Sequence, residues 1–440
     1  MKLPRFFKTQ KFYSLFSSVF NSAIALVTLG LLTRTLTREE FGQWAVFLTV
    51  YGFFEMALNG LIRTPVIRMA ANDQEYRYAE VLASAWDILI KTVLVFGTLI
   101  SLGFVVANQV TGDEIYFRIA YWFPLYCLLN LPQLIGMWNS NALMKFERII
   151  IIKSTSVIIF LLGVIYLRLV GGGFELVFWF YLLASACASL LVLSRGWASF
   201  KCYLNQPRTY RKAILNFGKF SMGTTISATA LTNSDALIIV YFLGPEALAL
   251  YEIPKRIRGM YHIPLRGILQ LTYPYLAKKM GRINSDEFKL EFQRILGFSF
   301  LALMPVTVLI FIFAEFLVTL LGGAEYAEAA TILRVFALIL FIAPFDRFSG
   351  LILDVLNRPN LNFTKVLIML TVNIIGDIVA IKLGYGIVGV ASVTMITNTA
   401  GIVYGFFMHR REAPFNLIAM FREGQFQFRL FFREFKYSLK

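Results

Sequence analysis

Residues 174–194 read FELVFWFYLLASACASLLVLS, a stretch whose single charged side chain, Glu175, lies at its start. A helix rises about 1.5 Å per residue, so about twenty such residues cross a hydrocarbon core of about 30 Å. Apolar stretches of similar length recur along all 440 residues, of which 58% are hydrophobic and only 15% are charged. Because long continuous apolar runs are typical of helices and not of barrel strands, we predict an all-α integral membrane protein.

The apolar stretches predict about twelve membrane-spanning helices in two sets of six. The first set is expected at about residues 12–32, 42–62, 82–107, 117–139, 149–168 and 174–194. The second set is expected at about residues 215–243, 246–276, 295–320, 328–355, 362–383 and 387–408. We therefore predict an N-terminal lobe, residues 1–205, and a C-terminal lobe, residues 206–409. The outer connections are expected to be short, the longest lying at residues 108–116.

Membrane topology explains the net charge of +16. With the N-terminus inside, the inside segments hold 29 of the 42 Lys and Arg residues. The outer connections hold few basic residues, namely Arg34, Arg38, Arg168 and Lys382. This distribution follows the positive-inside rule, so we expect both termini in the cytoplasm and no nucleic-acid partner. Residues 410–440 combine phenylalanines with basic residues, which predicts a helix on the anionic inner membrane surface.

Other aromatic residues are expected mostly at the two membrane interfaces, where tryptophan and tyrosine are enriched. The tryptophans assigned to these belts are Trp44, Trp86, Trp122, Trp138 and Trp179. Stacking against sugar rings is an alternative role for a few of them. The sequence alone does not select which.

Residues 251–267, YEIPKRIRGMYHIPLRG, place several cations inside a predicted span. Lys255, Arg258, His262 and Arg266 are three, four and four residues apart, so they share one face of a helix. Each Arg or Lys at the membrane centre costs about 2.5–3.5 kcal/mol, so this face must meet water, protein or an anion. Because Arg forks fit phosphate oxygens, we predict a cavity wall that binds a phosphate-bearing substrate.

The same residues allow a structural interpretation. Lys255 and Arg256 would pair with Glu252, while Arg266 extends to the inner membrane surface. We favour the binding role, because one carboxylate neutralises only part of this charge.

A second polar stripe lies on the second predicted helix, where Glu55, Asn59 and Arg63 are four residues apart. If the two lobes are related by an internal repeat, this stripe faces the same cavity as the cations of residues 251–267. The alternative is that Arg63 and Arg68 are ordinary inside-loop charges near the end of the helix.

The two predicted lobes look related to each other. LTREEFGQW, residues 36–44, follows the first predicted helix and matches LGPEALALY, residues 243–251, after the seventh. NALMKFER, residues 141–148, resembles DVLNRPN, residues 354–360. Six is an even number, so both lobes enter the membrane in the same orientation, as in transporters with parallel repeats. Such folds place the substrate between the halves.

Acidic residues also occur within the predicted spans. Asp235 and Asp377 are candidates for coupling transport to protons or sodium ions, because an intramembrane carboxylate marks an ion path or a salt bridge. The structural alternative for Asp235 is a pair with a cation of residues 251–267. Asp346 and Arg347 are adjacent and do not face each other, so either is a candidate to point into the cavity. We expect no catalytic residue, resident metal or cofactor, since the sequence has no nucleotide-binding motif and two histidines that lie far apart.

Taken as a whole, the chain resembles the polysaccharide transporter family of the multidrug/oligosaccharidyl-lipid/polysaccharide exporter superfamily, which includes the Wzx-type O-antigen flippases. The resemblance covers nearly all residues and rests on LLTRTLTREEFGQWAVF at 31–47, DALIIVYFLGPEALALYEIPKRI at 235–257, and polar turns after the fourth and tenth helices.

This resemblance implies two six-helix lobes around a basic cavity and a transporter, not an enzyme. It implies alternating access that moves a polyprenyl-diphosphate-linked oligosaccharide from the inner to the outer leaflet. The residues it assigns to the cavity are Arg63, Lys255, Arg258 and Arg266. It also implies a multi-pass protein of the bacterial inner membrane, with a polysaccharide polymerase and chain-length machinery as partners.

Three other functions fit parts of the sequence. A cation-coupled multidrug antiporter shares the fold, but an acidic or apolar cavity would suit its organic cations better. A peptidoglycan-precursor flippase usually has two further helices. A membrane glycosyltransferase or polysaccharide polymerase handles similar lipid-linked sugars, but such enzymes generally need sizeable outer loops.

Overall fold

The computed structural model describes residues 10–70, 77–112, 114–280 and 284–438, and within these ranges it is helical with no strand. The first elements are α2 (Gln10–Thr35), α3 (Arg38–Leu58), the π-helix η1 (Asn59–Arg63), α4 (Thr64–Ala70), α5 (Tyr78–Thr111), α6 (Glu114–Ala142), α7 (Phe146–Val170), α8 (Phe174–Ser194) and α9 (Phe200–Asn205). The later elements are α10 (Arg211–Leu243), α11 (Pro245–Lys279), α12 (Ser285–Ile312), α13 (Ala314–Gly322), the 3₁₀-helix η2 (Ala324–Ala329), α14 (Ala330–Val355), α15 (Pro359–Lys382), α16 (Gly386–His409) and α17 (Leu417–Ser438).

Nine helices in the described ranges are long and apolar enough to cross a membrane. The prediction of an all-α membrane protein is therefore confirmed. The described parts of the twelve predicted spans are helical, apart from Phe313 and Leu383. Phe313 divides the span predicted at 295–320 between α12 and α13, so a single continuous helix there was wrong.

The connection predicted at residues 108–116 is shorter than expected. Helix α5 continues to Thr111, and α6 begins at Glu114. Gly112 ends α5 in the left-handed conformation, with a φ of 71°, and its N–H bonds the carbonyl of Asn108. Glycine adopts this conformation without a Cβ penalty, so the turn needs very few residues. The nine-residue loop was therefore a wrong prediction, and Asn108 belongs to a helix.

Local capping explains the two junctions on which the family resemblance rests. Thr37 accepts a hydrogen bond from the backbone of Glu40 at 3.2 Å, and the Glu40 carboxylate accepts one from the Thr37 N–H at 3.0 Å. This reciprocal capping box starts α3 directly after α2. At the second junction Gly244, with a φ of 84°, ends α10, and Pro245 opens α11. Proline suits this first position because its N–H would have no partner there.

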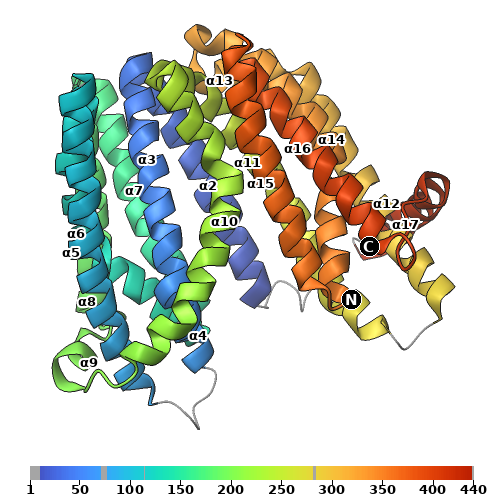
Figure 1. Ribbon diagram of the computed structural model, residues 1–440, viewed down its shortest axis with the longest axis horizontal. Coiled ribbons are helices and arrows are strands. Elements are labelled where there is room, and N and C mark those ends of the chain that lie inside the picture. The colour runs from blue at the N-terminus through green and yellow to red at the C-terminus, as the bar shows by residue number, and fades with distance from the viewer. Residues whose placement is uncertain (1–9, 71–76, 113, 281–283, 439–440) are drawn as a thin grey trace. The chain divides into compact units, whose positions relative to one another are not determined.

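The chain divides into two compact units within α10, an N-terminal unit that ends at Ala230 and a C-terminal unit that begins at Leu231. Within each unit the long helices run side by side (Figure 1). The sequence places a lobe boundary at 205/206, in the linker before α10. The structural division lies later because the first half of α10 packs against η1 in the N-terminal unit.

That packing brings backbone against backbone. A Cβ added to Gly60 would lie 2.5 Å from the Cα of Met222, and one added to Gly218 would overlap the carbonyl oxygen of Leu61. Pro65 has no N–H to donate to that carbonyl, as an α-helix would require. The chain instead forms a π-turn, in which the Thr64 N–H bonds the carbonyl of Asn59. Glycine is therefore needed on both sides of this contact.

We expect Gly218→Ala to destabilise the protein by about 3 kcal/mol or more, because neither backbone can move aside for the methyl group. The matched control is Gly223→Ala in the same helix, where an added Cβ meets nothing within 4 Å. Alanine there should change stability by at most about 1 kcal/mol, in the stabilising direction. Thermal unfolding of the purified variants in detergent measures both effects. Equal unfolding temperatures for the two variants would contradict this packing.

Most tryptophans assigned to interfacial belts are buried instead. Trp44, Trp86, Trp122 and Trp138 are all buried, whereas Trp179 is exposed. Trp44 illustrates the reason, since its ring packs against Phe47, Phe160, Phe178 and Tyr181 at 4.8–5.6 Å between centroids. Aromatic side chains bury large areas and prefer such edge-on and offset contacts. The belt assignment was therefore wrong for these four residues.

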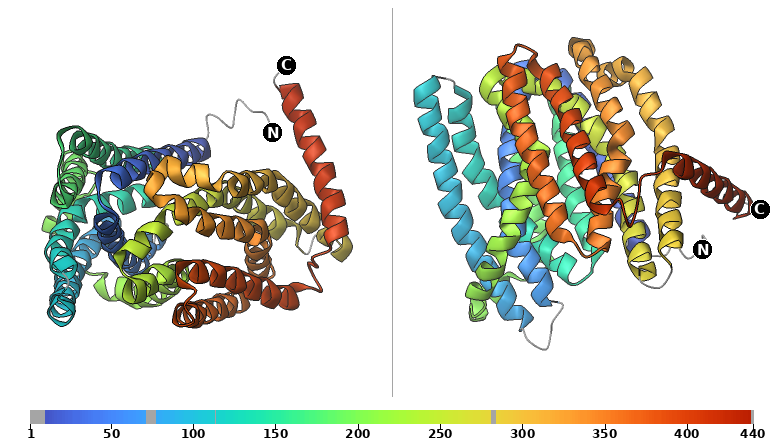
Figure 2. Two further views of the ribbon diagram at one scale, coloured as in Figure 1. Left: turned by 90° about the horizontal axis from the view of Figure 1, so that it is seen from above. Right: turned by 45° about the vertical axis from the view of Figure 1, so that its right-hand side comes forward.

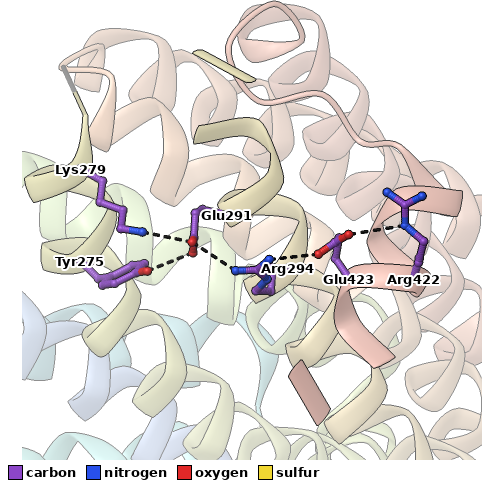
Figure 3. A network of polar contacts seen from close by, with 6 residues as sticks. All are labelled: Tyr275, Lys279, Glu291, Arg294, Arg422 and Glu423. Carbon is purple, nitrogen blue, oxygen red and sulfur yellow. Dashed lines mark hydrogen bonds and ion pairs between the residues drawn. The ribbon is translucent and has the colours of Figure 1, made fainter. Parts of the chain in front are cut away.

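Helix α17 runs across α12 in the C-terminal unit (Figure 2). The two backbones meet at glycines, because a Cβ on Gly424 would lie 2.5 Å from the carbonyl carbon of Gly297. Beside this crossing Arg294 bonds Glu291 of α12 at 3.3 Å and Glu423 of α17 at 3.2 Å (Figure 3). The segment after residue 410 thus contains a helix packed on the C-terminal unit. Its position on a membrane surface stays a prediction.

Candidate functional site

Of the cations predicted to bind substrate, Lys255, Arg258 and Arg266 lie on α11, which runs without interruption past Pro254 and Pro264. Arg258 is half-buried, with its guanidinium carbon 4.2 Å above the ring centre of Phe336 in α14. This cation–π contact holds the guanidinium at a fixed place. The hydroxyl of Tyr261 donates to the carbonyl of Leu340 at 3.0 Å, which fixes α11 against α14 at the same level.

Arg258, His262 and Arg266 form one electrostatic group, as their spacing predicts. Both arginines act electrostatically on His262, and so does Arg347 of α14, while Asp346 acts on it with the opposite sign. In the described ranges no carboxylate lies within ion-pair distance of Arg258 or Arg266. The group of Arg258, Arg266 and Arg347 around His262 is called the cation cluster below.

Lys255 differs from the other predicted cations. Its ammonium lies 2.8 Å from the carboxylate of Glu252, and Arg256 approaches the same carboxylate at 3.5 Å. Glu252 is buried, so this pairing compensates its charge. The structural interpretation therefore describes Lys255 and Arg256 correctly, whereas a binding role for Arg258 and Arg266 stays a prediction.

Of the adjacent residues Asp346 and Arg347, Arg347 belongs to the cation cluster, because Asp346 is buried in an ion pair with Lys365. The carboxylate of Asp346 lies 2.7 Å from the ammonium of Lys365, which also donates to the Asp346 carbonyl at 2.7 Å. Both residues are buried. Arg347 is 3.9 Å from the same carboxylate, and its side chain is 54% exposed. The sequence could not decide which of the two adjacent residues is accessible, and the buried Lys365 provides the answer.

The polar stripe predicted on the second helix, Glu55, Asn59 and Arg63, lies in the N-terminal unit. Arg63 and Lys153 both act electrostatically on the carboxylate of Glu55. The side-chain amide oxygen of Asn59 accepts a hydrogen bond from the indole N–H of Trp138 at 3.0 Å. Lys153, from α7, was not among the residues predicted for the site. Asn59 and Arg63 are the two ends of η1, and π-turns of this kind are frequent at functional sites.

The carboxylates of Asp235 and Asp377 accept hydrogen bonds from the same side-chain amide, that of Asn373. The Asn373 side chain donates to Asp235 at 2.8 Å and to Asp377 at 2.8 Å, and all three residues are buried. Asp235 also accepts from the hydroxyl of Tyr251. In the described ranges neither carboxylate has a Lys or Arg within ion-pair distance, so the proposed pair between Asp235 and an α11 cation is not formed. Among the residues that the structure describes, one oxygen of Asp377 has no hydrogen-bond partner.

This carboxylate pair has the chemistry of a small-cation site. Two buried carboxylates side by side repel each other, and each costs several kcal/mol to bury as an anion. A proton or a monovalent metal ion on the pair removes that cost. Tyr251 was not predicted as part of this site. Its contact with Asp235 joins α11 to α10 and depends on how the helices pack, which the sequence alone does not indicate.

Together, a bundle of helices long and apolar enough to cross a membrane, a cation cluster on α11 and α14 and a buried carboxylate pair are typical of membrane transporters. Residues 31–331 match the family described as polysaccharide biosynthesis protein. The chain belongs to this family.

Two curated relatives carry more specific names. A protein of Haloferax volcanii, named as a low-salt glycan biosynthesis flippase, is 23% identical over 240 residues, which are 53% of this chain and 51% of the relative. The chain thus spans about half the length of that protein. A protein of Yersinia pseudotuberculosis, named for O-antigen export, is 23% identical over 331 residues, covering 69% of this chain and 72% of the relative.

Solved structures identify the fold. The lipid II flippase MurJ in an inward closed conformation aligns with a TM-score of 0.74 and 14% identity, over 93% of this chain and 89% of that one. An inward-facing multidrug resistance MATE family transporter of the MOP superfamily aligns with a TM-score of 0.68 and 16% identity, over 89% and 94%. The predicted all-α transporter fold is therefore confirmed, and the family match confirms the predicted resemblance. The number of twelve spans and the cytoplasmic position of both termini stay predictions.

Proposed function

We propose that the protein is a flippase that moves a polyprenyl-diphosphate-linked oligosaccharide from the inner to the outer leaflet of the bacterial cytoplasmic membrane. The cargo is the repeat unit of an O-antigen, a capsule or an exopolysaccharide. Membership of a polysaccharide biosynthesis family supports this proposal, as do relatives named for glycan flipping and O-antigen export. The observation that carries it is the cation cluster, in which Arg258 and Arg266 have no carboxylate partner among the described residues.

The cation cluster suits the diphosphate of such a lipid. A diphosphate cannot cross hydrocarbon unaided, because desolvating a charge costs far more than thermal energy. Arg258 and Arg266 each offer a planar fork that binds phosphate oxygens through two parallel hydrogen bonds. Arg347 adds a third positive charge to the group. The glycan remains in a polar environment, while the polyprenyl chain stays in the bilayer.

We further propose alternating access driven by a cation that binds between Asp235 and Asp377. Both residues lie in the C-terminal unit with the cation cluster, and Tyr251 joins the two regions along α11. Neutralising the carboxylate pair by a proton or a sodium ion would change the field around the arginines. Coupling of the two events would make cation movement drive cargo movement. A polysaccharide polymerase and chain-length machinery then receive the product on the outer side.

We expect deletion of the gene to lower surface glycan at least tenfold and to raise the amount of lipid-linked oligosaccharide inside the cell. Both effects follow because a diphosphate lipid has no other low-cost path between leaflets. Immunoblots of surface glycan and mass spectrometry of extracted lipids measure them, with plasmid-borne wild type as the control. Unchanged surface glycan in the deletion strain would argue for a different cargo.

A further inference from the structure

The N-terminal unit contains a pocket of about 600 Å³ that the proposed function does not use. It lies where α5 ends and where α6 and α8 begin, and it is lined by aromatic residues together with Asn108, Arg118 and Glu175. Its volume falls within the range of about 300–1,000 Å³ typical of small-ligand sites. In the proposed orientation this is the outer end of the unit.

Three aromatic rings build a rigid corner in this pocket. Trp122 is buried and stacks on Phe178, with ring centres 5.4 Å apart and planes 10° apart. Trp179 and Tyr121 meet Trp122 nearly at right angles, at 5.0 Å and 5.2 Å. The Trp179 and Tyr121 residues are 53% and 60% exposed. The buried stack therefore holds two rings in place while much of their surface remains free for a ligand.

Polar groups of different kinds surround this corner. Arg118 supplies only donors, Glu175 supplies only acceptors, and the amide of Asn108 supplies both. Arg118 is held near the ring of Phe174 at 5.9 Å. A sugar ring has hydroxyls that donate and accept along its edge, and C–H bonds on its face. The faces of aromatic rings are negative and attract such C–H bonds.

Membrane anchoring and lipid-headgroup binding both fit the residues of this pocket less well than a sugar does. Interfacial Trp and Tyr residues anchor helices singly and need no pocket, no carboxylate and no buried supporting stack. A phosphatidylethanolamine headgroup would pair its phosphate with Arg118 and its amine with Glu175. That headgroup has no flat C–H face to stack on the rings of Trp179 and Tyr121, so it leaves these two rings without a role.

We propose that this pocket binds one or two sugar rings of a saccharide, with Trp179 and Tyr121 as stacking surfaces and Glu175, Asn108 and Arg118 as hydrogen-bonding partners. The assignment of that saccharide to the translocated glycan rests on the proposed function. The site would hold the glycan at the outer membrane interface after translocation, apart from the cation cluster that holds the diphosphate.

The test uses the full-length protein in nanodiscs and saturation-transfer NMR. The probe is the oligosaccharide released by mild acid from the lipid-linked pool of the native cells. We expect saturable binding to the wild type and binding about tenfold weaker for Trp179→Ala, since one stacked ring contributes up to about a factor of ten. Glu175→Gln, which keeps the shape of an exposed side chain, should also weaken binding severalfold.

Tyr166→Ala is the matched control, because Tyr166 is an aromatic of the same unit with the same 53% exposure, and it lies outside the pocket. It should bind like the wild type. Equal binding by all three variants, or displacement of the probe by glycerophosphoethanolamine, would overturn the proposal. A wild type that flips the lipid but binds no released oligosaccharide overturns this site alone. A wild type that binds it without flipping overturns the proposed function alone.

Discussion

We expect replacement of Arg258 and Arg266 together with glutamine to abolish export of the glycan while the protein remains in the membrane at its normal level. Each arginine offers a charge-assisted bidentate contact of about 1.5–3 kcal/mol. Loss of one contact therefore lowers transport about 10- to 100-fold, and loss of both lowers it to background. Quantified surface glycan and membrane immunoblots, in a strain that depends on the plasmid copy, give the two measurements.

The matched control is Arg256→Gln on the same helix. Arg256 shares the carboxylate of Glu252 with Lys255, so its removal leaves that buried charge compensated. We expect near-normal export from this variant. Replacing both Arg258 and Arg266 with lysine should restore part of the activity, because lysine keeps the charge and loses the fork. Normal export by the double glutamine variant would exclude the cation cluster as the diphosphate site.

We expect Asp377→Asn to make flipping independent of the imposed cation gradient. Asparagine keeps the shape of the side chain, but it carries no negative charge to attract a cation and cannot take up a proton. A tenfold gradient of one coupled cation supplies about 1.4 kcal/mol, so the wild type should concentrate cargo up to about tenfold and the variant should not. Removing one of two adjacent buried charges should leave the stability equal or higher.

The measurement is the initial flipping rate in proteoliposomes with a proton gradient, a sodium gradient or neither. Asp286→Asn is the control, because the Asp286 side chain is 89% exposed at the start of α12 and pairs with the nearby Lys289. That variant should respond to the gradient like the wild type. Full gradient stimulation of Asp377→Asn would show that the carboxylate pair has no part in coupling.

The sequence predicts the helices well because each span follows from its own composition. A run such as residues 174–194 has only one low-energy state in a membrane, so its helix is decided locally. The predicted helix boundaries are wrong where the conformation of a single residue determines them. Gly112 shortens a loop through its positive φ, and Pro65 lies just after a π-turn that no periodicity indicates.

The candidate site could be predicted only in part. Helical spacing places Arg258, His262 and Arg266 on one face of α11, and the structure agrees. Helical spacing could not show that Lys255 pairs with Glu252. A bound phosphate and the Glu252 carboxylate would both neutralise the charge of Lys255, so the sequence fits either partner. Arg347 and Tyr251 belong to this region through contacts between helices that are distant in the sequence. Such residues are found only when the fold is known.

The central claim is tested most directly by the leaflet position of a fluorescently labelled polyprenyl-diphosphate oligosaccharide in sealed vesicles. A membrane-impermeant quencher reports the fraction in the outer leaflet for empty vesicles, the wild type and the Arg258→Gln/Arg266→Gln variant. We predict that the wild type makes lipid from the inner leaflet accessible within minutes, whereas the variant behaves like empty vesicles. Equal accessibility in wild-type and empty vesicles would contradict the assignment as a flippase.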